Sequence, residues 1–389
     1  AQRMGASEIR ELLKLLEQPD VISFAGGIPD PDLFPIEAFQ HAYAAVLGNT
    51  ASAQQALQYS LSDGLLELRR WIAAYMGRLG APCTPDNILI TSGSQQGLEF
   101  LGRLLLSPGD AALVAWPTYL GALQAFNAYE PRYVRLDPRA NAPAPELPAG
   151  ATQAKFAYIV PDFANPTGET LSLAERERVI AIATDAGAIV IEDGAYSELR
   201  YEGERQPPLI AVDAAAAGGV DNCRTVYCGT FSKTLSPGLR VGWMVAAAPL
   251  IQKLVLVKQA SDLHSAPLNQ MAIARVAEAV FDAQVERNRA TYRIRRDAML
   301  AALDRHMPKG FRWNRPEGGM FVWVEGPPGL DGRKLLERAV TRERVAFVPG
   351  QAFFADGSGQ ECMRLSFSLA DPGEIAEGVR RLAAAIPEN

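Results

Sequence analysis

The 389-residue sequence has few of the residues on which disulfide scaffolds, zinc sites and histidine chemistry depend. Its four cysteines include no CxxC pair, and its three histidines lie far apart in the sequence. This spacing argues against a disulfide framework and against a metal site, and it favours reduced thiols in a cytoplasmic protein. We therefore expect chemistry that does not centre on histidine.

The sequence also lacks long apolar runs and an excess of basic residues. The longest near-apolar stretch, around residues 241–251, is too short for the roughly 20 residues that span a bilayer. The first residues contain no apolar signal-peptide core, so we expect a cytoplasmic protein. With 38 basic and 44 acidic residues the net charge is −6, and no basic run marks a surface for nucleic acid or an anionic membrane.

Short β-rich runs alternate with helical stretches from about residue 86 onward. Several of the runs are apolar on both faces, which is typical of parallel strands covered by helices. The alternation predicts an α/β fold with an open, mostly parallel sheet and right-handed crossovers. Strands are expected at 88–91, 112–115, 156–160, 188–192, 225–228 and 241–245, and long helices at 95–106, 173–186 and 268–304.

The two ends of the chain differ from this central region. An amphipathic helix is expected over residues 7–17, with Ser7 as its cap, and an irregular Gly/Pro-rich connection follows it. After residue 290 the pattern predicts a smaller α+β unit. Its strands are expected at 320–324, 346–349 and 363–369. We expect residues 41–290 to form a large domain, and residues 1–40 and 291–389 to form a small one.

Polar residues follow four of the expected strands, at the edge where open α/β sheets bind their ligands. Gly93, Ser94 and Gln95 open a helix, where backbone N–H groups and the helix dipole favour an anion. An ordinary helix cap uses the same residue types, so both readings stay open. Asn165 lies in a Pro/Gly turn that follows the next strand. This segment is either only a turn, or a turn from which the Asn165 side chain donates a hydrogen bond into a cleft.

A carboxylate and a lysine follow the next two strands. Asp193 ends a buried strand beside a second carboxylate, and capping of the next turn is the alternative role. Lys233 lies with Thr230, Ser232 and Arg240 between apolar strands. Desolvation and a nearby cation help a lysine to deprotonate and form an imine, and the hydroxyls and arginine suit a phosphate. Together the strand ends offer the groups that pyridoxal 5′-phosphate (PLP) needs.

Along nearly its whole length the sequence resembles the fold-type I, class I/II PLP-dependent aminotransferases. The run 232–242, the Asn-Pro-Thr-Gly turn at 165–168 and Asp193-x-x-Tyr196 occur in the order and spacing of that family. Segments 7–11 and 22–29 resemble the subgroup of 2-aminoadipate and kynurenine aminotransferases. The resemblance implies transfer of an amino group between an L-amino acid and a 2-oxo acid. The expected acceptor is 2-oxoglutarate, and the donor a 2-aminoadipate, aromatic or branched-chain amino acid.

The resemblance also implies a role for each matching residue. Lys233 would form the Schiff base with PLP and move the proton, and Asp193 would pair with the pyridine nitrogen. Tyr196 and Asn165 would bind the 3′ oxygen of the ring. Further cofactor contacts would come from Gly93, Ser94, Gln95, Tyr119, Thr230, Ser232, Arg240 and, across a homodimer interface with shared active sites, Tyr59. Substrate contacts would come from Arg364, Asn165, Gly27, Tyr59 and Arg10.

Two of these arginines have simpler alternative roles. Alternation over 363–369 puts Arg364 on a polar face with Ser366 and Ser368, and a surface ion pair is the alternative to binding the substrate α-carboxylate. Arg10 lies in the first turn of the expected N-terminal helix, where a cation gains nothing from the helix dipole. It would pair with a nearby glutamate or bind the distal carboxylate of an acidic substrate.

Two other functions share these features. A β-lyase or decarboxylase would use the same cofactor residues, and product analysis with and without a 2-oxo acid would separate it from an aminotransferase. The non-enzymatic alternative is a transcription regulator that contains an aminotransferase-like domain. We expect no DNA-binding domain here, because few residues precede the segment 22–29 and the chain is acidic.

Overall fold

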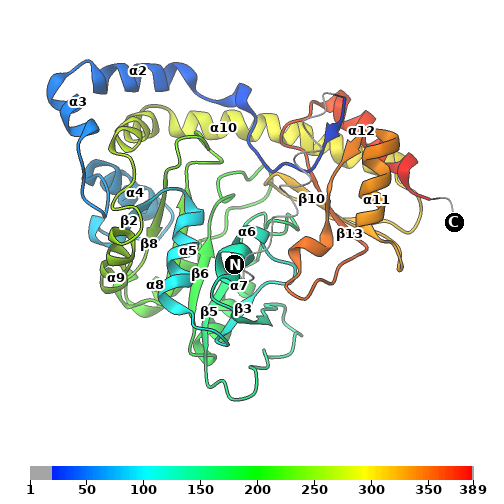
Figure 1. The fold of residues 1–389 in the computed structure, drawn as a ribbon, viewed down its shortest axis with the longest axis horizontal. Coiled ribbons are helices and arrows are strands. Elements are labelled where there is room, and N and C mark those ends of the chain that lie inside the picture. Colours follow the sequence, from blue (N-terminus) through cyan, green and yellow to red (C-terminus); the bar gives the residue numbers. More distant parts are fainter. Residues whose placement is uncertain (1–19, 388–389) are drawn as a thin grey trace.

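The computed structural model describes residues 20–387, so the helix expected over residues 7–17, and Arg10 with it, lies outside the described residues. A seven-stranded sheet forms the centre of the molecule, and a smaller sheet lies beside it (Figure 1). The strand order of the larger sheet is β2-β8-β7-β6-β5-β3-β4. Its strands are β2 (Ile88–Thr91), β3 (Ala111–Val114), β4 (Arg132–Arg135), β5 (Ala154–Ile159), β6 (Ile189–Asp193), β7 (Thr225–Thr230) and β8 (Gly242–Val245).

The mostly parallel α/β sheet expected from the sequence is confirmed, with one strand reversed. β8 is antiparallel to both β2 and β7, and the other neighbouring pairs are parallel. The sequence pattern does not indicate which strand is reversed. β7 and β8 are joined by a loop without a helix, and such a short connection suits an antiparallel pair.

Alternation along the strands directs side chains into two apolar layers. In β2, Leu89 packs in one layer, while Ile88 and Ile90 pack in the other. The Leu89 layer is covered by α5 (Ser94–Leu105), α6 (Leu120–Asn127) and α9 (Ala248–Gln259). The opposite layer is covered by α4 (Leu66–Arg78), α7 (Leu173–Asp185), α8 (Leu209–Ala217) and the first part of α10 (Pro267–His306).

Capping residues explain where several helices begin. Ser172 and Glu175 form a reciprocal capping box at the start of α7, and Asp371 does the same with Glu374 at the start of α12 (Pro372–Ala385). Pro267 occupies the first turn of α10, where its missing N–H costs nothing. Short 3-10 turns occur at η1 (Pro31–Leu33), η2 (Pro85–Asn87), η3 (Val220–Asn222) and η5 (Gly350–Phe353).

The smaller sheet has four antiparallel strands in the order β12-β13-β10-β9. These strands are β9 (Arg312–Trp313), β10 (Phe321–Glu325), β12 (Val348–Pro349) and β13 (Cys362–Ser366). α11 (Gly332–Arg338), the π-helical turn η4 (Ala339–Glu343) and α12 belong to the same region, shown in orange to red in Figure 1.

The single strand expected at 346–349 is wrong. β11 (Val345–Ala346) pairs with β1 (Ile22–Ser23), whereas β12 pairs with β13. Phe347 lies between them and is fully buried. The chain changes its pairing partner at this residue, and four consecutive apolar residues give no sign of such a change.

The N-terminal arm and α10 connect the two regions. β1 attaches the arm to the smaller region, and α2 (Ile36–Leu47) and α3 (Thr50–Leu57) then lead toward the large sheet (Figure 1). The expected domain boundary at residue 290 falls inside α10, which continues without a break to His306. Among residues 20–387, no helix combines the length and the apolar character needed to cross a membrane.

Candidate active site

The carboxyl ends of β2, β7, β6 and β5 lie at one edge of the large sheet, because these four strands run in the same direction. Gly93, Asn165, Asp193 and Lys233 end or follow these strands. The chain enters β8 from the same edge, which brings Arg240 there as well. The polar groups that the sequence placed at separate strand ends are therefore neighbours in the fold.

Lys233 lies in the loop after β7, with its amine close to other charged groups. Its Nζ donates a hydrogen bond to the carbonyl oxygen of Gly27 at 2.9 Å. Burial is the main reason why the pKa of Lys233 is lowered to about 8. The charges of Arg364 and Arg240 act in the same direction, and Asp193 opposes them. An amine with this pKa is available as a nucleophile and as a proton carrier near neutral pH.

Asp193 ends β6 with a buried carboxylate. Its Oδ2 accepts a hydrogen bond from the Tyr158 hydroxyl at 2.9 Å, and its Oδ1 accepts one from the Ala195 N–H at 3.3 Å. Burial raises the pKa of Asp193 to about 6, and these two hydrogen bonds limit the rise. The carboxylate is thus mostly ionised at pH 7 and suits a positively charged nitrogen.

The neighbouring carboxylate, Glu192, has a structural role instead. It accepts hydrogen bonds from the N–H groups of Leu209 at 2.8 Å and Ile210 at 2.9 Å, where α8 begins. Glu192 therefore caps the start of α8, whereas the capping of the next turn that the sequence left open is made by Asp193 itself, through the Ala195 N–H. Asp193, one residue later, lies on the other face of the sheet.

The turn between β2 and α5 forms a cradle for an anion. Gly93 has φ +84° immediately before α5, and a side chain there would overlap the guanidinium of Arg240. Arg240 Nη2 donates to the Ser92 carbonyl oxygen at 3.3 Å. A Cβ on Gly242 would lie 2.7 Å from the Ser94 nitrogen, so glycine lets β8 approach the turn. The N–H groups that open α5 and the Arg240 charge thereby converge.

Hydroxyl groups and an aromatic ring border this cradle. Thr230 and Ser232 are joined by a hydrogen bond of 2.9 Å between their hydroxyl oxygens. Gln95 Nε2 donates to the Gly121 carbonyl oxygen at 2.6 Å, and the Tyr119 hydroxyl lies 3.5 Å from Gln95 Oε1. Five of the cofactor contacts implied by the family resemblance lie at or beside this turn, and their role toward a phosphate stays a prediction: Ser94, Gln95, Thr230, Ser232 and Arg240.

Asn165, Tyr196 and Arg364 form a chain of contacts across the two regions of the molecule. Asn165 Nδ2 donates to the Tyr196 hydroxyl at 3.3 Å, and Arg364 Nη1 donates to Asn165 Oδ1 at 2.8 Å. Lys233 Nζ lies 5.8 Å from the centre of the Tyr196 ring. These side chains come from β13 of the smaller sheet and from loops of the larger one, so the site lies between the regions.

The surface ion pair considered for Arg364 is wrong, because its side chain is buried in the middle of β13. The guanidinium lies 4.3 Å from the Phe321 ring centre and 5.1 Å from that of Phe353. Arg364 Nη2 donates to the Ala25 carbonyl oxygen at 2.6 Å, but the buried Nε has no hydrogen-bond partner. A buried donor without a partner is costly, so this group is suited to receive an anionic ligand.

The backbone of Gly27 approaches both Lys233 and the Phe321 ring, and only a residue without a side chain fits there. A Cβ at this position would lie 2.6 Å from the tip of the Phe321 ring. The same residue accepts the hydrogen bond from Lys233. Tyr59, by contrast, is 79% exposed, and its ring lies edge to face with that of His264 at 5.7 Å between the ring centres.

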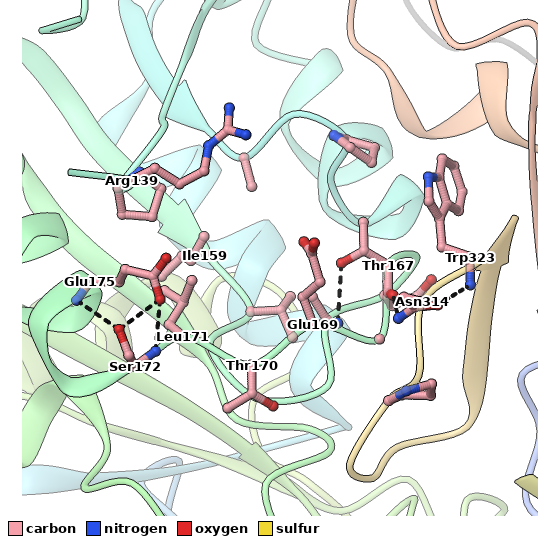
Figure 2. A pocket seen from close by; sticks show the side chains of 18 of the residues that line it. Arg139, Ile159, Thr167, Glu169, Thr170, Leu171, Ser172, Glu175, Asn314 and Trp323 are labelled. Atoms are coloured by element: carbon pink, nitrogen blue, oxygen red, sulfur yellow. Dashed lines mark hydrogen bonds between the residues drawn. The ribbon is translucent and has the colours of Figure 1, made fainter. Parts of the chain in front are cut away.

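A cavity of about 760 Å³ adjoins the Asn165 side of the site. It runs between the 135–139 loop, the 164–172 turn and the hairpin that carries Asn314 and Trp323 (Figure 2). Asn314 Oδ1 accepts the N–H of Trp323 at 2.8 Å, and Asn314 Nδ2 donates to the Thr167 carbonyl oxygen. Both residues that Asn314 contacts are labelled in Figure 2. Lys233 and Asp193 do not line this cavity, and Asn165 is the site residue that borders it.

Sequence reasoning missed Tyr158, which fixes the Asp193 carboxylate. Tyr158 pairs with Ile191 in the register of β5 and β6, and Asp193 follows two residues later on the same face. Alternation within two adjacent strands could have found this contact. The packing of Phe321 and Phe353 around Arg364 left no comparable signal.

The fold and these groups define an enzyme of the PLP-transferase type, in which a lysine amine and a buried aspartate face each other beside an anion cradle. The family model described as "Aminotransferase class I and II" matches residues 19–382. The chain belongs to this family. The family resemblance, the fold class and the PLP cofactor predicted from the sequence are therefore confirmed.

Relatives agree with this assignment. The chain is 44% identical to the 2-aminoadipate transaminase of Thermus thermophilus, over 99% of this chain and 95% of that protein. It is 42% identical to aromatic-amino-acid aminotransferase 1 of Thermococcus litoralis, over 99% and 92% respectively. The crystal structure of the Thermus thermophilus α-aminoadipate aminotransferase with N-(5′-phosphopyridoxyl)-L-leucine has a TM-score of 0.87 at 41% identity, covering 99% of this chain and 95% of that one.

Proposed function

We propose that this aminotransferase moves the amino group of an L-amino acid to 2-oxoglutarate, with Lys233, Asp193 and Arg364 as its central residues. The observation that carries the proposal is the convergence of these three side chains between the two sheets. The pKa of Lys233 is lowered by burial and by the charge of Arg364, and Asp193 opposes that effect. An amine, a carboxylate and a carboxylate-binding guanidinium are the groups that the reaction requires.

The residues fit PLP on two structural grounds. The cradle at Gly93 exists only without a side chain, and it brings helix N–H groups and Arg240 together for a phosphate. Asp193 is a buried carboxylate held by Tyr158 and suits a protonated ring nitrogen. When bound, PLP supplies an electron sink for charge at the substrate Cα.

The chain's own side chains divide the remaining work. Lys233 would attach the cofactor and would carry the proton to and from the substrate Cα. Asp193 would hold the proton on the ring nitrogen. Asn165 and Tyr196 would donate hydrogen bonds to the 3′ oxygen, and Tyr119 would pack against the ring. Arg364 and Asn165 would bind the substrate α-carboxylate, with the Gly27 backbone beside them.

Arg364→Ala should raise KM for every amino acid and every 2-oxo acid tested. All of these molecules present an α-carboxylate, and alanine cannot replace a bidentate guanidinium pair. We expect kcat/KM to fall by roughly tenfold to a hundredfold, the scale of one or two charge-assisted hydrogen bonds. Steady-state kinetics with a monocarboxylic and a dicarboxylic donor measures this effect.

Arg312→Ala is the matched control, because Arg312 lies in the same sheet but its side chain is 83% exposed in a pair with Glu325. It should leave KM unchanged. If Arg364→Ala impaired only dicarboxylic substrates, Arg364 would bind their distal carboxylate and the proposed role would fail.

We propose a homodimer in which Tyr59 of the partner subunit completes the phosphate site. Leu57, Tyr59 and Leu61 are 73%, 79% and 70% exposed in the single chain. Three neighbouring exposed apolar side chains support a covered surface. The exposed Tyr59 side chain is available to a second copy of the chain.

Mixing two impaired variants tests the shared site. Lys233→Ala and Tyr59→Ala should each be poorly active, but a hybrid dimer contains one site with both native residues. After the subunits are mixed and allowed to exchange, transamination should exceed the sum of the two parents. Activity that never exceeds this sum, or a monomeric mass by light scattering, would contradict the shared dimer.

The substrate class rests on the relatives, one named for 2-aminoadipate and one for aromatic amino acids. We propose donors of these two kinds, with branched-chain amino acids as the third candidate. A screen of L-amino acids against 2-oxoglutarate, with detection of glutamate, tests the proposal directly. Formation of the same product without any 2-oxo acid would favour a β-lyase or a decarboxylase.

We also propose that residues 1–40 and 291–389 form a small domain and residues 41–290 a large one. Pairing of β1 with β11 supports the first grouping, although α10 runs through the boundary. Limited proteolysis that separated the chain at a different place would contradict the domain division.

The net charge of −6 supports small-molecule substrates over nucleic acid, and we propose a cytoplasmic location.

A further inference from the structure

We propose that Lys258 is a positioning residue that fixes the phosphate-binding turn from behind; the inference rests on the proposed PLP function. Lys258 lies in the last turn of α9, and its side chain is fully buried. Its Nζ donates hydrogen bonds to Gln96 Oε1 and to Asp262 Oδ1, both at 2.9 Å. It also lies 5.8 Å from the centre of the Phe100 ring.

The partners of Lys258 reach the turn directly. Gln96 lies in the first turn of α5, and its Oε1 also accepts the backbone N–H of Ser92 at 2.9 Å. Gln96 Nε2 donates to Asp262 Oδ2 at 2.7 Å, and the Ser92 hydroxyl lies 3.3 Å from the same oxygen. The Ser92 hydroxyl also lies 3.2 Å from that of Ser265. Residue 92 is therefore held through both its backbone and its side chain.

Arg240 holds the same residue by its other backbone group. The Ser92 carbonyl oxygen accepts from Arg240 Nη2, while the Ser92 N–H is held by Gln96. The turn that precedes Ser94 is thus fixed between Arg240 and the network around Lys258. Arg240 is expected to touch the phosphate, whereas Lys258 acts on the turn through Gln96 and Asp262.

Lys258→Met leaves Asp262 without its lysine partner. Removing one partner of an ion pair is most costly when the remaining charge is fully buried. Asp262 keeps a 31% exposed side chain, so water can solvate its carboxylate after Lys258 is removed. Gln96, however, would lose the donor that orients its Oε1 toward Ser92. We therefore expect Lys258→Met to fold and to loosen the turn.

The test compares two ligands that differ only in the phosphate. PLP and pyridoxal are titrated into the apo form of the full chain, and dissociation constants are measured by absorbance and fluorescence. Lys258→Met should weaken PLP binding about tenfold and leave pyridoxal binding within about twofold of the native chain. Lys253→Met, on the exposed side of α9, is the matched control and should change neither constant.

Asp262→Asn is the second variant, because it removes charge from the same network and leaves Lys258 in place. It should weaken PLP in preference to pyridoxal, by a smaller factor. Equal weakening of both ligands in the two variants, or no weakening in either, would overturn the positioning role. A native chain that bound PLP no better than pyridoxal would instead overturn the phosphate site of the proposed function.

Discussion

Lys233→Ala should lose transamination almost entirely while still binding PLP. The lysine amine is the nucleophile and the proton carrier, and no other described amine lies at the edge of the sheet beside Asp193. Proton transfer by a positioned side chain contributes about a hundredfold to ten-thousandfold, so we expect a loss of at least this size. PLP should remain bound because the cradle around Gly93 and Arg240 is unchanged. Single-turnover kinetics and a PLP titration measure the two effects separately.

Lys253→Ala controls for the loss of a lysine elsewhere in the same region. Lys253 is exposed on α9, so its replacement should alter neither turnover nor cofactor binding. If Lys233→Ala kept more than a tenth of the native rate, another group would have to carry the proton. That result would remove Lys233 from the centre of the account.

Asp193→Asn should bind cofactor but turn over at least about a hundredfold more slowly. A neutral amide cannot hold the proton on the ring nitrogen, so the electron sink is weakened in the transition state. The buried, charge-assisted bond that is lost corresponds to several kcal/mol in the barrier. The pKa of Asp193 is about 6, which leaves the native carboxylate charged at pH 7 where the comparison is made.

Loss of stability does not explain this expected defect. Burial raises the pKa of Asp193 above its unfolded value, so the folded state binds the proton more tightly. Its ionisation therefore opposes folding, and stability falls as pH rises from about 4 to about 6. A neutral asparagine avoids this cost, and the Tm of the apo variant at pH 7 should not lie below that of the native chain.

Glu192→Gln is the control for changing a carboxylate on β6. Glu192 faces α8 and accepts two backbone N–H groups, so its replacement should affect Tm more than turnover. The opposite pattern would be slow turnover in Glu192→Gln and turnover within about threefold of native in Asp193→Asn. A threefold change corresponds to less than about 1 kcal/mol in the activation barrier. This pattern would show that the wrong carboxylate had been assigned to the ring nitrogen.

The sequence was sufficient to predict the parts of the site that follow strand ends. Asp193, Asn165 and Lys233 lie at one edge because parallel strands bring their carboxyl ends together, and the family spacing identified them individually. The reversed direction of β8 was not predictable from its apolar pattern, since parallel and antiparallel buried strands look alike.

Contacts between distant segments could not be predicted in the same way. Arg364 and Asn165 are 199 residues apart and meet only because the smaller sheet packs against the larger one. Alternation put Arg364 on a polar face, but that face is buried against Phe321 and Phe353 and does not meet solvent. Lys258 resembled any other lysine at the end of a helix until its contact with Gln96 was known.

Borohydride reduction of the PLP-loaded protein is the most direct test of the central claim. Reduction fixes the cofactor to the lysine that holds it, and proteolysis with mass spectrometry identifies the modified peptide. We predict one modified site, at Lys233, with loss of the yellow colour and of activity in parallel. Modification at Lys253 or Lys258, with Lys233 left free, would contradict the account.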